Sequence, residues 1–111
     1  MATVTKASVP SGAALRERTV AALRAMEGDL RRRGVLGLGL YGSLARAEAT
    51  PSSDVDLLLT VERGAPFTLL DMSEVRLLVA DRLGRDAGVV VDEDVSPEFR
   101  QRIADDLVTI Y

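Results

Sequence analysis

The stretch between Tyr41 and Leu59 constrains this chain most, because two polar motifs lie there between two apolar segments. Gly42-Ser43 ends the first apolar segment, and Asp54-Val-Asp56 begins the second about ten residues later. A glycine after a strand lets the backbone turn sharply, and a serine there can cap a helix N-terminus that favours an anion such as phosphate. Asp54 and Asp56 share one face of a strand, about 6.5–7 Å apart. Such a pair suits Mg²⁺, which binds one or two carboxylates together with phosphate oxygens and water.

Each of these motifs has an ordinary alternative when it is taken alone. Asp54 and Asp56 are also consistent with two solvated aspartates at the entry of a strand. Arg46 lies one turn along the short helix predicted for 43–49, where it could add a cation near phosphate or pair with Glu48 or another acid. The coincidence of the turn, the arginine and the acidic pair favours a single triphosphate and metal site.

Composition excludes several kinds of chemistry. The 111 residues contain no cysteine and no histidine, so disulfides, thiolate or histidine metal sites and Ser/His/Asp or Cys/His catalysis are ruled out. The absence of cysteine suits a reducing compartment, and we expect a cytoplasmic protein. No apolar run approaches the length of a membrane span, and the first nine residues lack the pattern of a secretory signal. Residues 51–111 carry six basic and thirteen acidic side chains, which argues against duplex DNA as a partner.

Periodicity predicts the order α-β-α-β-α-β-α, which indicates a small α/β (α+β) domain over 11–111 after a loose tail at 1–10. We expect a mixed sheet of three to four strands flanked by helices. The predicted helices cover about 13–33, 43–49, 68–83 and 97–106, with caps at Ser11, Thr68 and Ser96. The predicted strands cover 35–41, 54–61 and 87–91, and 107–111 is either the end of a helix or a short edge strand.

One motif in the first predicted strand is misleading. Gly37-Leu-Gly39-Leu-Tyr-Gly42 matches the G-x-G-x-x-G pattern of dinucleotide-binding folds. That fold requires a strand before the first glycine and a long helix after the last one. Only two residues separate Gly37 from Gly34, so we place these glycines within a strand whose Leu36, Leu38 and Leu40 share one face.

The quoted residues resemble the DNA polymerase beta-like nucleotidyltransferases. Gly42-Ser43-x-Ala45-Arg46 followed by Ser53-Asp54-x-Asp56-Leu57 is similar to the signature of that superfamily. The closest likeness is to the minimal nucleotidyltransferases encoded beside HEPN-domain proteins, and it extends to Leu-Gly-Arg at 83–85 and to the segment from Ser96 to Tyr111. The resemblance implies that Gly42, Ser43, Arg46 and Ser53 bind the nucleotide and its phosphates.

The resemblance also implies an activity. Such proteins bind ATP with two Mg²⁺ ions, held here by Asp54 and Asp56, and transfer AMP to a hydroxyl with release of pyrophosphate. The minimal members act as antitoxins that modify a HEPN-family toxin, which we therefore expect as the partner in a hetero-oligomer. Transfer to a small molecule such as an antibiotic is a weaker alternative, because it normally requires a second domain.

Two residues depart from the family pattern. Ala47 stands where a glycine usually follows the arginine. Gly88 stands where the third metal-binding carboxylate is expected, and loss of such a group costs about 10²–10⁴-fold in rate. Asp86 faces the same side two residues earlier and is a candidate substitute, whereas Asp92 lies about 13 Å beyond Gly88 along the strand. The alternative function is therefore a catalytically degenerate antitoxin that neutralises its partner by contact alone.

Overall fold

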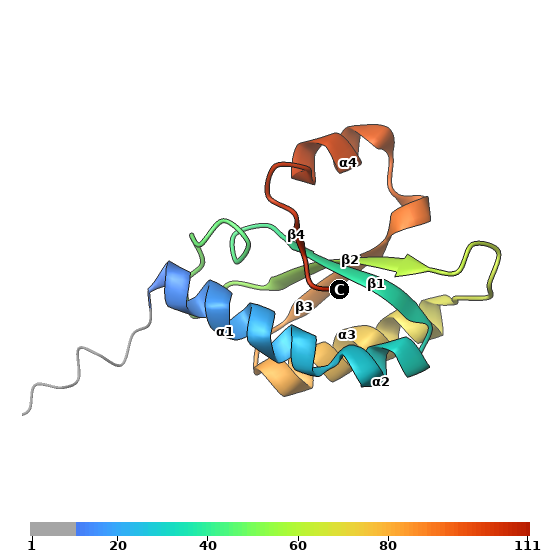
Figure 1. Cartoon of the computed structure of the whole chain (residues 1–111), viewed down its shortest axis with the longest axis horizontal. Coiled ribbons are helices and arrows are strands. Elements are labelled where there is room, and N and C mark those ends of the chain that lie inside the picture. Colours follow the sequence, from blue (N-terminus) through green and yellow to red (C-terminus); the bar gives the residue numbers. More distant parts are fainter. Residues whose placement is uncertain (1–10) are drawn as a thin grey trace, which may run out of the picture.

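The computed structural model of this protein describes residues 11–111, which form a four-stranded sheet with helices on both faces (Figure 1). The strand order is β3-β2-β1-β4; β1 pairs antiparallel with β2 and β4, and β2 pairs parallel with β3. The strands are β1 Val35–Tyr41, β2 Val55–Val61, β3 Ala87–Val91 and β4 Val108–Thr109. The helices are α1 Gly12–Ala25, α2 Glu27–Arg32, α3 Leu69–Leu83 and α4 Pro97–Ile103, with a 3-10 turn, η2, at Asp92–Asp94. The predicted mixed sheet with flanking helices is confirmed, and the predicted tail lies outside the described residues.

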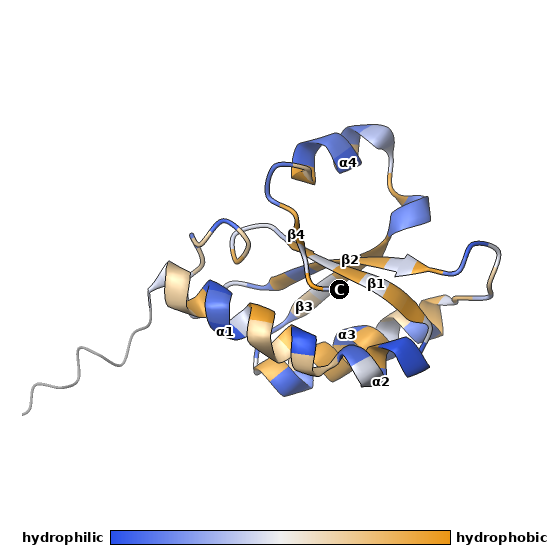
Figure 2. Ribbon diagram, in the orientation of Figure 1, coloured by the Kyte–Doolittle hydropathy of each residue, from blue (hydrophilic) through white to orange (hydrophobic). Residues whose placement is uncertain are grey.

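The hydrophobic core lies between the sheet and the layer formed by α1, α2 and α3 (Figures 1 and 2). Helix α3 connects the parallel strands β2 and β3, as such a pair requires a crossover segment. Helix α4 lies on the opposite face of the sheet (Figure 1). Among residues 11–111, no helix is both long and apolar enough to cross a membrane. The largest fully buried side chains are Leu23, Met26, Leu30, Leu40, Leu44, Leu57 and Leu59.

The first helical region differs from the prediction of one helix over 13–33. Ser11 caps α1 as expected, and its hydroxyl accepts a hydrogen bond from the Ala14 amide. The helix is interrupted at Met26, whose amide donates to Leu23 and whose side chain is buried. The second helix, α2, then ends before Gly34, which has a φ of +96°. Leu30 of α2 is fully buried, as Leu23 of α1 is, so both helices contribute to the core.

Strand β1 also corrects one detail of the sequence analysis. The register shifts between Val35, which pairs with Val61, and Gly37, which pairs with Thr60. This irregularity moves Val35 into the core and leaves Leu36 47% exposed, so Leu36 does not share the buried face of Leu38 and Leu40. The two glycines lie inside the strand, and the rejection of the dinucleotide-binding interpretation is confirmed.

The second half of the chain follows the sequence prediction closely. Thr68 and Asp71 form a reciprocal capping box at the start of α3, and Gly84 ends that helix in the left-handed conformation. Helix α4 begins after the Ser96 cap but ends at Ile103, three residues earlier than expected. The segment after it resolves the alternative left open at 107–111, since β4 is a short edge strand against β1.

Candidate active site

Asp54 and Asp56 lie at the start of β2, at the end of the sheet where β1 finishes and β3 begins. Val55, Leu57 and Leu59 point into the core, so the alternation of a strand places Asp56 on the opposite face. Asp54 is exposed and Asp56 is half-buried. In the sheet, Asp56 is paired with Tyr41 on one side and with Gly88 on the other.

The Asp56 carboxylate packs directly against the Gly42 turn. Gly42 has a φ of +80°, which disfavours any residue with a side chain. A Cβ atom at this position would overlap Oδ2 of Asp56 and lie 3.3 Å from its Cγ. The predicted phosphate turn and the second predicted metal ligand are therefore in contact, although fourteen positions separate them in the sequence.

The short helix predicted for 43–49 is wrong, because the segment forms only one turn. Amide hydrogen bonds run from Ala47 to the Leu44 carbonyl and from Glu48 to the Ser43 carbonyl. This pattern is a Schellman ending, in which the left-handed residue is Ala47 with a φ of +61°. Because Gly42 at one end and Ala47 at the other both have positive φ, no second turn forms, and a single turn cannot offset the cost of helix nucleation.

The turn nevertheless presents backbone donors toward the site. Within residues 11–111, the amides of Ser43, Leu44 and Ala45 donate to no backbone carbonyl. Leu44 is fully buried and anchors the turn, while Ser43 is half-buried. Successive free amides in a tight turn form a favourable environment for an anion.

Arg46 is engaged by two acids. Its Nε donates to Glu48 Oε1 and its Nη1 donates to Asp106 Oδ2, both at 2.9 Å. These two carboxylates raise the pKa of Arg46, with Glu48 contributing most. The pairing with an acid that the sequence left as an alternative is thus present. Asp106 is sixty positions away, and no sequence pattern pointed to it.

Ser53 stabilises the loop before the acidic pair by hydrogen bonds. Its hydroxyl accepts a hydrogen bond from the Thr50 amide at 2.9 Å, and its carbonyl accepts one from Arg85 Nη1 at 2.8 Å. The Arg85 side chain also reaches the Thr50 carbonyl at 3.4 Å. These contacts fix the path of the chain into Asp54, which is a supporting role beside the nucleotide contact predicted for Ser53.

Gly88 occupies the position on β3 beside Asp56, as the alignment of motifs predicted. A Cβ atom there would lie 3.6 Å from Asp56 Oδ1, which is ordinary van der Waals contact. Asp86 is exposed at the entry of the same strand, where its carbonyl accepts a hydrogen bond from the Val55 amide at 2.8 Å. The structure therefore confirms that Gly88 is adjacent to the acidic pair, whereas Asp86 belongs to the strand entry.

The pKa shifts at the site reflect burial and the closeness of two carboxylates. Burial and the neighbouring charge of Asp54 raise the pKa of Asp56, and Arg46 partly opposes the shift. Burial followed by the charge of Asp56 raises the pKa of Tyr41. A divalent cation between the carboxylates would relieve this repulsion.

The acidic pair fits one Mg²⁺ ion better than two. Within residues 11–111, no group of three or more Asp, Glu, His or Cys side chains is placed to hold a metal ion. Two carboxylates suffice for an ion that takes its remaining ligands from phosphates and water. Asp54 and Asp56 could therefore hold one nucleotide-bound ion. A second ion would need a further carboxylate, and the position beside Asp56 on β3 is Gly88, which has none.

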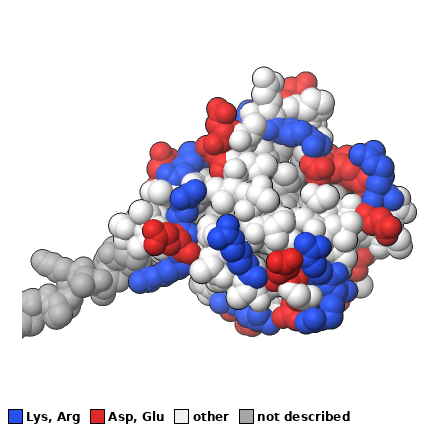
Figure 3. All heavy atoms as spheres, viewed as in Figure 1, with Lys and Arg blue, Asp and Glu red and all other residues white. Residues whose placement is uncertain are grey.

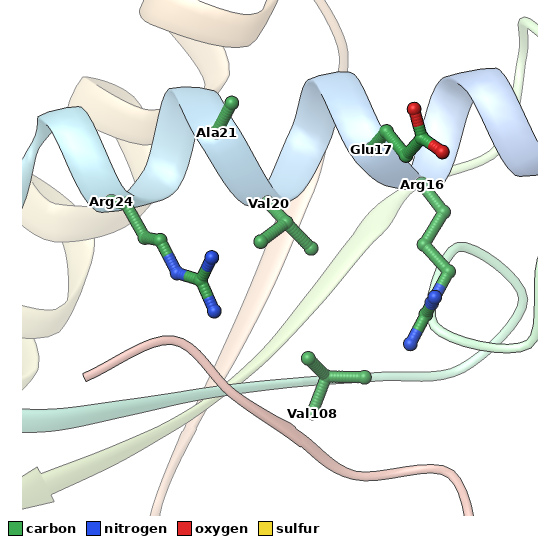
Figure 4. Close-up of a pocket in the computed structure, with 6 residues that line it drawn as sticks. All are labelled: Arg16, Glu17, Val20, Ala21, Arg24 and Val108. Atoms are coloured by element: carbon green, nitrogen blue, oxygen red, sulfur yellow. The ribbon is translucent and has the colours of Figure 1, made fainter.

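Cavities elsewhere on the molecule do not coincide with the acidic pair. One of about 320 Å³ lies between α1 and β4, with Arg16 and Arg24 on either side of Val20 and Val108 (Figure 4). Another of about 440 Å³ borders the site, because its lining includes Gly88 on β3 as well as the first half of α3. On the face shown in Figure 3, basic and acidic side chains are interspersed over α1 and α2.

Residues 23–110 match the nucleotidyltransferase domain family. The protein therefore belongs to this family. A relative from Methanocaldococcus jannaschii, MJ0435, is 31% identical over 81 residues, which span 73% of this chain and 85% of the relative. Its name proposes that it is a protein adenylyltransferase.

Solved structures agree with this assignment. A protein described as a proposed minimal nucleotidyltransferase aligns with a TM-score of 0.66 and 31% identity over 91% of this chain and 97% of its own. A complex of a tri-AMPylated HEPN toxin with its MNT antitoxin from Shewanella oneidensis contains a chain that aligns with a TM-score of 0.63. That alignment covers 86% of this chain and 71% of the other at 14% identity, so it supports the fold alone. The expected likeness to the minimal nucleotidyltransferases is confirmed.

Proposed function

We propose that this protein transfers AMP from Mg²⁺-bound ATP to a hydroxyl group of a HEPN-family toxin and thereby acts as its antitoxin. The observation that carries the proposal is the contact between the Gly42 turn and the Asp56 carboxylate, which places the turn proposed to bind phosphate beside the carboxylate proposed to bind the metal. The name of MJ0435 supports protein adenylylation, and the AMPylated toxin in the Shewanella oneidensis complex supports a HEPN partner.

In this proposal the residues act mainly by position and charge. Asp54 and Asp56 would hold Mg²⁺, which supplies Lewis-acid polarisation of the phosphates when bound. The free amides of Ser43 and its neighbours would cradle the phosphates, and the Gly42 turn keeps that cradle against the carboxylates. Preorganised charges of this kind stabilise the charge that develops in the transition state.

Replacing the exposed metal ligand tests the assignment. We expect Asp54→Ala to abolish transfer of labelled AMP from ATP to the partner, because it removes a proposed metal ligand. The fold should be retained, since Asp54 is exposed, precedes β2 and supports no core packing. Asp81→Ala, at an exposed position of α3, is the matched control and should transfer AMP at the unaltered rate. Undiminished transfer by Asp54→Ala would refute the site.

The partner can be sought by genetics. We expect the neighbouring reading frame to encode a small helical protein with an Arg-x-x-x-x-His motif. The acceptor hydroxyl can then be mapped by mass spectrometry of that protein after incubation with ATP and the antitoxin. A neighbour unrelated to HEPN proteins, together with no modification of a HEPN protein, would argue against the toxin–antitoxin part of the proposal.

A second candidate function is favoured by one observation, the glycine beside Asp56. Because Gly88 offers no carboxylate, the chain can be a binding antitoxin that retains the fold and neutralises its partner by contact. The two functions differ in one measurement: a contact antitoxin protects cells even with Asp54→Ala, whereas an adenylylating antitoxin loses protection with that variant. Asp86→Asn tests the remaining substitute ligand, and a loss of transfer would assign it that role.

A further inference from the structure

The C-terminal segment contacts the phosphate turn at two points. Phe99 of α4 packs edge-to-face on Tyr41, with ring centroids 5.7 Å apart and an interplanar angle of 89°. Asp106, three residues beyond the end of α4, accepts the hydrogen bond from Arg46. Tyr41 directly precedes Gly42, and Arg46 lies inside the turn. The segment from α4 to Asp106 thus contacts the residue before the turn and a residue within it.

The contact between Arg46 and Asp106 places a carboxylate on the cation that a nucleotide phosphate would approach. The Arg46 guanidinium faces two carboxylates, Glu48 and Asp106, so this cluster carries an excess of negative charge. A triphosphate approaching the Gly42 turn therefore meets an arginine that already donates to two carboxylates through Nε and Nη1.

We propose that Asp106 is a positioning residue that competes with the nucleotide phosphates for Arg46. This role rests on the proposed nucleotide site and adds to it a coupling with the C-terminal segment. When a triphosphate takes the guanidinium, the Asp106 end of the segment loses its tie to the turn. Linkage makes the effect reciprocal, so a partner that draws this segment away from the turn strengthens nucleotide binding.

The test is calorimetric titration of the full chain with Mg-ATP. We expect Asp106→Asn to bind about two- to fivefold more tightly than the unaltered protein, as expected for one exposed ion pair, with a larger gain at low ionic strength. Damage to the fold would weaken binding instead. Asp105→Asn is the matched control, because Asp105 is an exposed neighbour that forms no ion pair within residues 11–111. It should leave the dissociation constant unchanged.

Two further variants separate competition from general repulsion. Asp106→Glu keeps the acid and should bind Mg-ATP like the unaltered protein. In an Arg46→Gln background, Asp106→Asn should no longer tighten binding, because the residue for which it competes is absent. Weaker or unchanged binding by Asp106→Asn, or an equal gain in Asp105→Asn, would overturn the role of Asp106 alone. Absence of Mg-ATP binding by the unaltered chain would overturn the proposed function together with it.

Discussion

Gly42, in the turn after β1, and Gly88, in β3, flank the Asp56 carboxylate from opposite sides of β2, yet the structure needs only Gly42 to be glycine. At position 42 the backbone has a positive φ, and a side chain would overlap Oδ2 of Asp56. Position 88 has neither restriction, since its Cβ would stand 3.6 Å from Oδ1 of the same residue. The backbone geometry of the site requires glycine at position 42. At position 88 the fold has room for a side chain, such as the carboxylate that the family pattern predicts there.

The largest effect should come from adding a methyl group at the first of these positions. We expect Gly42→Ala to abolish Mg-ATP binding and to lower the free energy of unfolding by about 2–4 kcal/mol, because it combines the left-handed strain with overpacking against Asp56. Chemical denaturation and calorimetric titration measure the two effects.

Gly64→Ala is the matched control for the strain alone. Gly64 has an almost identical φ of +81°, and a Cβ there would meet no atom within 4 Å. We expect it to lose only about 1 kcal/mol and to bind Mg-ATP normally. Equal losses from Gly42→Ala and Gly64→Ala would show that contact with Asp56 adds nothing and would remove the difference between the two glycines.

The second prediction concerns the position with free space. The Cβ of Gly88→Asp has room beside Asp56. The variant should raise the rate of AMP transfer, by up to about 10²-fold if a metal-activating carboxylate is the missing group. Mg²⁺ should also raise the unfolding temperature of this variant more than that of the unaltered protein. Gly88→Asn has the same shape without the charge and should gain neither property. If Gly88→Asp folds but gains neither faster AMP transfer nor a larger stabilisation by Mg²⁺, the absence of a carboxylate at position 88 does not limit the site.

The third prediction concerns protonation of the carboxylate between the two glycines. Because the pKa of Asp56 is raised in the folded protein, its contribution to stability is present below the ordinary value near 3.8 and is lost as pH rises through the raised value. Asp56→Asn should therefore gain stability relative to the unaltered protein as pH increases from about 3.5 to 7. The gain should stay below about 1 kcal/mol, since the carboxylate is partly solvated. Urea denaturation across this range in the absence of metal checks the sign, and a gain that grows toward low pH would contradict it.

The sequence was informative wherever local chemistry decides the structure. Ser11, Thr68 and Ser96 mark helix starts by hydrogen bonds within a few residues, and all three act as predicted. The acidic pair could be assigned because alternation along β2 fixes which side chains leave the core. The irregularity at Leu36 could not be foreseen, since it depends on how β1 registers against β2.

Contacts between distant segments account for what the sequence analysis missed. Asp106 reaches Arg46 only because β4 returns the chain end to the edge of β1. The same limitation applies to Phe99 on Tyr41, which no periodic pattern connects. The failure of the helix predicted for 43–49 has a different origin, because two residues with positive φ confine it to one turn.

The smallest predicted effect comes from that turn and extends the comparison to a third position. Ala47 adopts the left-handed conformation that Gly42 also needs, and a side chain is tolerated there at a cost. Ala47→Gly should remove about 1 kcal/mol of strain and lose about half of that to the greater entropy of the unfolded chain, for a net gain near 0.5 kcal/mol. Glu48→Gly, one position later in the turn, lacks that strain and should lose stability instead. Thermal unfolding of both variants measures the difference. A loss of stability in Ala47→Gly would mean that packing of the Ala47 methyl group outweighs the left-handed strain. A side chain would then be stabilising at position 47, whereas it is destabilising at position 42.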